Sequence, residues 1–190
     1  AGLAAYKADK LKETKNVVLV DAGDAIQGDL AGALSKGDYI VDIMNQVGYD
    51  VAVPGNHEFD FGMDQFLALT KKSNAKYISS NFTDTKANKT VFDPYVIKEL
   101  GGKKVAFVGI STPESITKST PAFFQDEKGN YIYDFCNDKT GKKLYKAVQN
   151  AIDAAKAEGA DYVIALGHMG IDDQSKPWTS REVIANTTGL

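Results

Sequence analysis

Three apolar runs of this chain are each closed by a glycine, and a polar residue of metal-ligating type follows each of those glycines. The runs and their polar residues are, in chain order, 17–20 with Asp24, 51–53 with Asn56, and 163–166 with His168. Short β-branched runs that end in glycine are typical of buried parallel strands that turn sharply at their C-terminal ends. Because these ends line one edge of an open α/β sheet, we expect the three polar side chains to meet at one rim.

The three side chains offer a carboxylate, an amide oxygen and an imidazole, which together suit Zn²⁺, Mn²⁺ or Fe²⁺. Asp24 can place its two oxygens on two ions at once, and the ions of two-metal sites lie about 3.5–4 Å apart. Asn56 and His168 are neutral ligands, so they leave the positive charge available to a phosphate group. The residues therefore predict a hydrolase in which two divalent metal ions lower the pKa of a bound water to about 7.

A second histidine follows the amide ligand directly. His57 is next to Asn56, and Asp60 comes three residues later. If this segment is a helical or 3₁₀ turn, the Asp60 carboxylate can accept a hydrogen bond from the ring of His57. An imidazolium oriented in this way can donate a proton to a leaving group or stabilise the charge that develops on it. We therefore hypothesise that His57 and Asp60 form a catalytic pair.

Each of these residues also has a simpler explanation when it is considered alone. An aspartate in a turn after a strand is more often a cap than a metal ligand. A fourth apolar run, 105–110, contains Gly109 but leads to no strong ligand, so a glycine at a strand end is not diagnostic by itself. The chain has only two histidines, however, and both lie just after strand-end glycines. We expect Glu58 to bond backbone or neighbouring groups within its turn rather than a metal.

Composition excludes several other classes of protein. The formal net charge of −3 argues against a basic surface for a nucleic-acid polymer. The single cysteine, Cys136, excludes an internal disulfide and a cysteine-rich metal site. No apolar stretch approaches the roughly 20 residues of a transmembrane segment. The 190 residues contain no evident linker, so a single domain over 1–190 is predicted.

The order of the predicted elements indicates a layered α/β fold. Helices are predicted over 3–14, 39–47, 63–73 and 142–158, with a weaker one over 180–186. Strands are predicted over 17–20, 51–53, 77–80, 91–99 and 103–110, with a further strand that ends at His168. Gly101 and Gly102 predict a hairpin turn. The segment 111–139 is rich in turn-forming residues and is predicted to be a long loop with one short strand at 131–135.

Longer motifs around these residues resemble the calcineurin-like metallophosphoesterases. The motifs are DAGDAIQG at 21–28, GNHEFDFG at 55–62 and LGHMG at 166–170. Within that superfamily the chain is similar, over essentially its whole length, to the bacterial 5′-nucleotidase / 2′,3′-cyclic-nucleotide 2′-phosphodiesterase family. The motif at 55–62 is highly specific, whereas the one at 166–170 would be weak alone.

The resemblance implies that Asp24 bridges two metal ions, that Asn56 and His168 are further ligands, and that His57 with Asp60 is the catalytic pair. It implies a four-layer α/β/β/α sandwich, hydrolysis of small nucleotide phosphoesters, and export to the periplasm, cell wall or exterior. The family's Asp-x-His and Gly-His-x-His metal motifs are absent. The resemblance therefore implies a catalytic domain that is truncated at both ends and lacks the C-terminal nucleoside-binding domain. We expect such a chain to be nearly inactive alone and to self-associate through a truncated sheet edge.

Two other functions stay open at this point. The first is a pyrophosphohydrolase of nucleotide sugars or a phosphatase of broad specificity. The second is a scaffold that keeps the fold without catalysis. A scaffold would have no reason to keep all five of the residues Asp24, Asn56, His57, Asp60 and His168.

Overall fold

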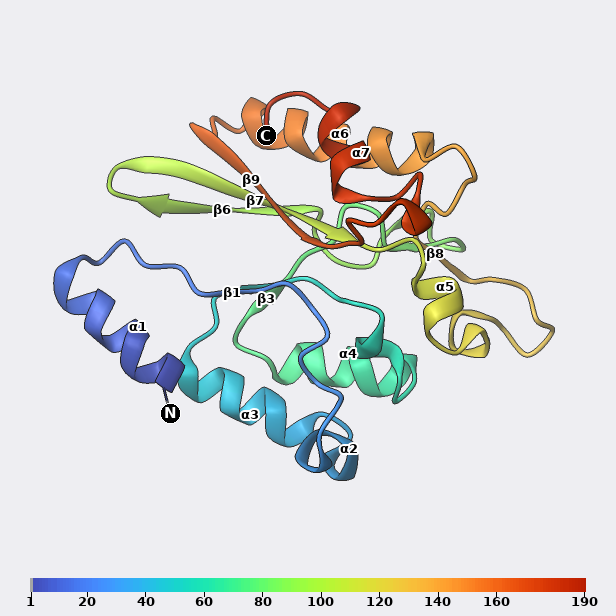
Figure 1. The fold of residues 1–190 in the computed structure, drawn as a ribbon, viewed down its shortest axis with the longest axis horizontal. Coiled ribbons are helices and arrows are strands. Elements are labelled where there is room, and N and C mark those ends of the chain that lie inside the picture. The colour runs from blue at the N-terminus through green and yellow to red at the C-terminus, as the bar shows by residue number, and fades with distance from the viewer. Residues whose placement is uncertain (1) are drawn as a thin grey trace.

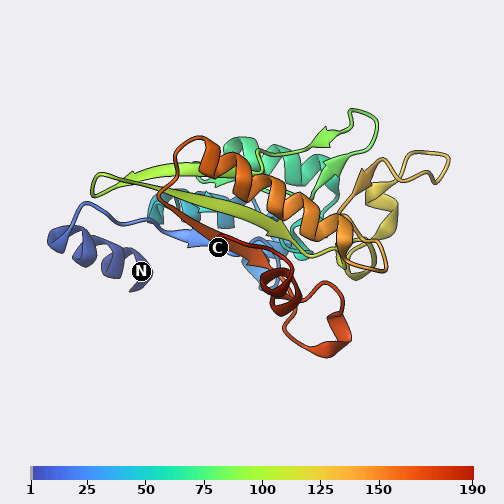
Figure 2. The same ribbon diagram turned by 90° about the horizontal axis from the view of Figure 1, so that it is seen from above.

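Four layers stack in the order helices, sheet, sheet, helices (Figure 1). The computed structural model describes residues 2–190. Helices α3 (Asp38–Val47) and α4 (Met63–Lys72) lie outside the first sheet, and α6 (Lys142–Ala157) and α7 (Ser180–Ala185) lie outside the second. The predicted α/β/β/α sandwich is therefore confirmed. Seen from above, α6 runs across the second sheet, and α1 (Gly2–Glu13) lies apart at the N-terminal end (Figure 2).

The first sheet consists of three short parallel strands. They are β1 (Val20–Asp21), β2 (Val51–Ala52) and β3 (Lys76–Tyr77), which lie side by side in chain order. Helix α3 connects β1 to β2 and α4 connects β2 to β3, so the chain crosses the same face twice and all strand ends point one way. Gly48 ends α3 in the left-handed conformation, with φ 83°.

The second sheet mixes antiparallel and parallel pairs. It consists of β6 (Tyr95–Leu100), β7 (Lys103–Ser111) and β9 (Tyr162–His168), with β7 in the middle. The predicted hairpin turn joins β6 to β7, with φ 59° at Gly101 and 78° at Gly102. Helix α6 crosses over to β9, which pairs parallel to β7 so that Ser111 faces His168. A third, antiparallel sheet contains β5 (Lys89–Thr90), β4 (Thr83–Asp84) and β8 (Tyr133–Asp134).

Separate apolar clusters hold the layers together. Val51, Val53, Ile78, Phe107 and Leu166 form the layer between the first and second sheets. The amphipathic face of α6 packs on β7 and β9. Another cluster surrounds Phe59, whose ring makes edge contacts with four other phenylalanines at centroid distances of 5.0–5.4 Å: Phe66, Phe82, Phe124 and Phe135. This cluster anchors the segment 55–62, which contains the most specific motif.

Several predictions about individual elements are wrong. The segment 111–139 is not one loop with a single strand, because it also contains α5 (Ser115–Lys118) and the 3₁₀ turn η2 (Pro121–Phe124), ordered by burial of Phe124 and Phe135. Three elements were missed because they are too short to show periodicity: α2 (Leu30–Ser35), β4 and β5. The predicted strand at 91–99 begins only at Tyr95. Two further 3₁₀ turns are η1 (His57–Phe59) and η3 (Asp173–Ser175).

Helix α1 forms where predicted, but it buries no residue completely. Its contact with the rest of the protein includes an ion pair between Lys7 and Asp50, 3.1 Å apart. No helix in the described part of the chain has the length and apolar character needed to cross a membrane.

Candidate functional site

Asp24 lies in the turn that follows β1, in a backbone conformation that few residues other than glycine adopt. Its φ is 62°, and that of the preceding Gly23 is 94°. Hydrogen bonds hold this conformation: the backbone N–H of Asp24 donates to Glu58 Oε2 at 2.6 Å, and its Oδ1 accepts from the backbone N–H of His57 at 2.8 Å. Left-handed conformations of this kind persist where the surroundings enforce them, and they concentrate at functional sites.

The turn that follows β2 packs directly against the Asp24 turn. A Cβ atom added to Gly23 would lie 2.5 Å from the backbone N of Gly55, and one added to Gly55 would lie 2.2 Å from Asp24 Oδ1. Only glycine at both positions allows the two turns to approach so closely. The next residue, Asn56, is buried, with 7% of its surface exposed.

His168, the last residue of β9, reaches the same place from the other sheet. Its Nδ1–H donates to the carbonyl oxygen of Ala22 at 2.9 Å, which leaves Nε2 facing the two turns. Nε2 lies 3.1 Å from Asp24 Oδ2 and 3.2 Å from Asn56 Oδ1. The structure therefore brings the three side chains together as expected. They do not share one rim, however, because Asp24 and Asn56 follow strands of the first sheet and His168 ends a strand of the second.

The charges in this cluster reinforce one another. The hydrogen bond with Asp24 raises the pKa of His168, although partial burial opposes the shift. Partial burial acts to raise the pKa of Asp24, but the hydrogen bonds from His168 and from the His57 backbone outweigh it, so this pKa is lowered. Asp21 lies nearby, and burial raises its pKa. The cluster thus favours the ionised carboxylate of Asp24 and the protonated, positively charged form of His168 beside it.

The geometry of these three donors fits a metal ion. Ligand atoms lie about 2.0–2.2 Å from such an ion, so neighbouring ligand atoms are about 3.0–3.5 Å apart. The separations of His168 Nε2 from the oxygens of Asp24 and Asn56 fall in this range. Donation of Nδ1–H to a backbone carbonyl is also how metal-bound histidines are oriented. Within residues 2–190, His, Cys, Asp and Glu side chains alone form no group of three that could hold a metal, because the third donor here is an amide.

His57 and Asp60 form a pair beside this cluster. The segment is the 3₁₀ turn η1, and it brings His57 Nδ1 to 2.6 Å from Asp60 Oδ2. Ser119 donates to the other carboxylate oxygen at 3.4 Å. The hydrogen bond with Asp60 raises the pKa of His57, so its imidazolium form persists to higher pH than is usual. The His57 side chain is 44% exposed, so its ring is accessible to a ligand from solvent.

The side chain that sequence reasoning undervalued is Glu58. It is 1% exposed, and its carboxylate accepts from backbone N–H groups of Asp24, Ala25 and Gly55. Burial raises its pKa to about 7, and the backbone N–H donors of Asp24 and Gly55 oppose the rise. The expectation that it bonds backbone groups is confirmed, but two of its partners lie in the other turn. Its place inside the motif at 55–62 was the only signal available in the sequence.

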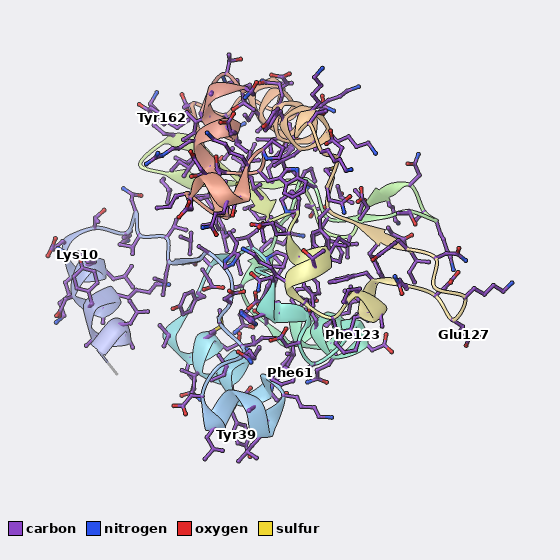
Figure 3. The ribbon with its side chains drawn as sticks, turned by 45° about the vertical axis from the view of Figure 1, so that its right-hand side comes forward. Lys10, Tyr39, Phe61, Phe123, Glu127 and Tyr162 are labelled. Atoms are coloured by element: carbon purple, nitrogen blue, oxygen red, sulfur yellow. The ribbon has the colours of Figure 1, made fainter. Side chains whose placement is uncertain are left out.

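An open pocket of about 410 Å³ lies next to the η1 turn. Phe61, which follows Asp60, and Phe123 of η2 are both on its wall, and Figure 3 places them on neighbouring segments. Tyr133 and the polar side chains of Asp64 and Gln125 also line it.

Comparison with known proteins places this geometry in context. The family described as "Bacterial capsule synthesis protein PGA_cap" matches residues 17–188. The chain is 29% identical over 182 residues to a 2′,3′-cyclic-nucleotide 2′-phosphodiesterase/3′-nucleotidase of Haemophilus influenzae, covering 85% of this chain and 25% of the relative. It is 32% identical over 183 residues to the snake venom 5′-nucleotidase of Gloydius brevicauda, covering 91% of this chain and 29% of the relative.

Among solved structures, the calcineurin-like phosphoesterase YfkN of Bacillus subtilis aligns with a TM-score of 0.77 and 26% identity. The alignment covers 99% of this chain and 60% of that one. The chain spans only about a quarter of the length of the two curated relatives above.

Proposed function

Because the chain belongs to the family described as Bacterial capsule synthesis protein PGA_cap and has the fold of a calcineurin-like phosphoesterase, we propose that it hydrolyses nucleotide phosphoesters with the help of two divalent metal ions. The observation that carries the proposal is the convergence of Asp24, Asn56 and His168 on one point from two sheets. The names of the relatives, a nucleotidase and a cyclic-nucleotide phosphodiesterase, support nucleotides as substrates.

In this proposal Asp24, Asn56 and His168 are the residues that would hold the ions, and each would supply part of a coordination sphere. When bound, such ions polarise phosphate oxygens and lower the pKa of water to about 7. Asn56 is neutral and His168 would coordinate as a neutral imidazole, so of these three side chains only the Asp24 carboxylate would offset the charge of the ions. The remaining positive charge is then available to bind an anionic phosphate.

In this proposal His57 and Asp60 form the pair that transfers a proton to the leaving group. The Asp60 carboxylate holds Nδ1–H of His57, which directs Nε2 of the ring outward. The hydrogen bond with Asp60 raises the pKa of His57 and so favours the imidazolium form, in which Nε2 carries a proton that His57 can donate to the leaving-group oxygen. The His57 backbone also contributes, because its N–H holds Asp24 Oδ1.

The relatives support two further parts of the proposal. The first is that residues 1–190 are a single, incomplete catalytic domain, which the match of one family model to residues 17–188 supports. Export of the protein is supported by the resemblance to an enzyme named from snake venom.

The test is release of phosphate from 5′-AMP and ring opening of 2′,3′-cyclic AMP, with and without added Mn²⁺ or Zn²⁺. Three donors are fewer than two ions require, since each takes about four ligands or more, so we expect slow turnover that depends on added metal. Asp24→Asn should abolish both turnover and metal binding measured by calorimetry. Asp9→Asn, the same change on exposed α1, is the matched control.

Metal-independent turnover, or an Asp24→Asn variant that keeps wild-type metal affinity, would contradict the proposal. Absence of both metal binding and turnover in the wild type would contradict it too. Preference for a nucleotide sugar over both nucleotides would favour the pyrophosphohydrolase alternative.

A further inference from the structure

A single buried carboxylate joins the two turns that carry Asp24 and Asn56. One oxygen of Glu58, Oε2, accepts from the backbone N–H of Asp24 and from that of Gly55, both at 2.6 Å. The other oxygen, Oε1, accepts from the N–H of Ala25 at 2.7 Å. The Asp24 turn follows β1 and the Gly55 turn follows β2, so Glu58 belongs to one turn and bonds both.

These bonds determine the separation of the two turns. Because Oε2 is shared, the N–H groups of Asp24 and Gly55 must point at the same atom. This shared acceptor brings Gly23 and Gly55 so close together that neither position has room for a side chain. The N–H bond also holds Asp24 at φ 62°, a conformation that costs free energy and that neighbouring groups must enforce.

Glu58 is itself excluded from ligating a metal. All the partners of its oxygens are N–H donors, and its side chain is 1% exposed. Its chemistry is also specific, because the three backbone N–H donors favour the ionised carboxylate, which offers only acceptors. A glutamine of the same shape would turn an NH₂ group toward one set of backbone N–H donors and repel it.

We propose that Glu58 is a positioning residue, which holds the Asp24 turn and the Asn56 turn at the separation that lets both side chains share a cation. This inference rests on the proposed function, since it assigns Asp24 and Asn56 to the metal. Outer groups that orient metal ligands typically contribute about 10–100-fold to metal affinity. Glu58 acts by fixing the backbone of the two turns, and it does not touch the ligand side chains themselves.

The experiment is a calorimetric titration of the 190-residue chain with Mn²⁺ alone. We expect Glu58→Gln to weaken Mn²⁺ binding about 10–100-fold relative to wild type. Glu158→Gln is the same chemical change at the end of α6, and it should leave the affinity unchanged. Ile152→Val removes one methyl from the fully buried face of α6 and lowers the melting temperature without touching the turns, so it controls for general destabilisation.

A second variant and a second measurement cover the case in which Glu58→Gln does not fold. Glu58→Asp keeps the charge but is one methylene shorter, so it cannot reach both turns, and we expect at least a tenfold loss of Mn²⁺ affinity. In the wild type, NMR should find the amide protons of Asp24 and Gly55 strongly protected from exchange.

Each outcome decides the matter. A Glu58→Gln or Glu58→Asp variant that binds Mn²⁺ within twofold of wild type overturns the inference alone. The inference is also overturned if Ile152→Val loses as much Mn²⁺ affinity as the Glu58 variants do. Rapid exchange of the Asp24 and Gly55 amide protons in the wild type overturns it too. A wild-type chain that binds no Mn²⁺ instead overturns the proposed function, and the inference with it.

Discussion

Replacement of Gly55 by alanine should disrupt the candidate metal site through a single methyl group. The added Cβ would lie 2.2 Å from Asp24 Oδ1 and 2.8 Å from the backbone N of Asp24. Ordinary contacts begin at 3.4 Å, so these atoms must move away by 3.4 − 2.2 = 1.2 Å and 3.4 − 2.8 = 0.6 Å. Neither can move freely, because Oδ1 is held by the His57 N–H and the backbone N by Glu58.

The displacement sets the expected magnitude. Metal sites tolerate changes of only about 0.2 Å in ligand distance, and a misplacement of about 1 Å at a reacting centre costs on the order of 100-fold. We therefore expect Gly55→Ala to weaken Mn²⁺ binding about 10–100-fold. Overpacking of this kind also costs about 1–3 kcal/mol of stability, which lowers the melting temperature by about 2–4 °C per kcal/mol in a domain of this size.

The assay combines Mn²⁺ calorimetry with thermal unfolding followed by circular dichroism. Gly167→Ala is the matched control, since it precedes His168 directly but its Cβ would meet its neighbours at 3.5 Å or more. We expect this control to keep its metal affinity. If Gly55→Ala bound Mn²⁺ within twofold of wild type, the argument that the two turns must touch to form the site would be refuted.

Three further predictions follow from other contacts. His57→Ala should lower turnover by about 10²–10⁴-fold while the bound Mn²⁺ stays near wild type; a matching loss of metal would make His57 a ligand instead. Phe59→Ala, which empties the centre of the aromatic cluster, should cost about 3–5 kcal/mol in urea unfolding, and a loss below 1 kcal/mol would contradict the anchoring role. The pKa of Asp161 is lowered because the backbone N–H of Lys104 donates to it. Its contribution to stability is therefore present above the unfolded pKa of about 3.9 and lost as the pH falls through the lowered folded value. Asp161→Asn should thus reduce the difference between the midpoints of urea unfolding at pH 7 and at pH 3. An unchanged difference would show that the hydrogen bond from the Lys104 N–H to Asp161 is not formed.

Long periodic elements could be predicted well from the sequence. Helix α6 repeats its apolar residues over sixteen positions, and α3 ends at Gly48 as its pattern indicates. Helix α2 and strands β4 and β5 were missed because two to six residues are too few to display a period. Leu30 and Leu34 of α2 are in addition mostly exposed, so its apolar residues mark no buried face.

The sequence by itself determined which residues make up the candidate site. Asp24, Asn56 and His168 follow glycines at strand ends, and the distance from His57 to Asp60 is one turn of a 3₁₀ helix, so this local spacing together with the surrounding motifs identifies them. Only the tertiary structure decided how the site is assembled. His168 bonds Ala22 across 146 positions of the chain, and Glu58 bonds Asp24 across 34. No local pattern encodes such contacts, because they result from the packing of two sheets face to face and from the close approach of two glycine turns.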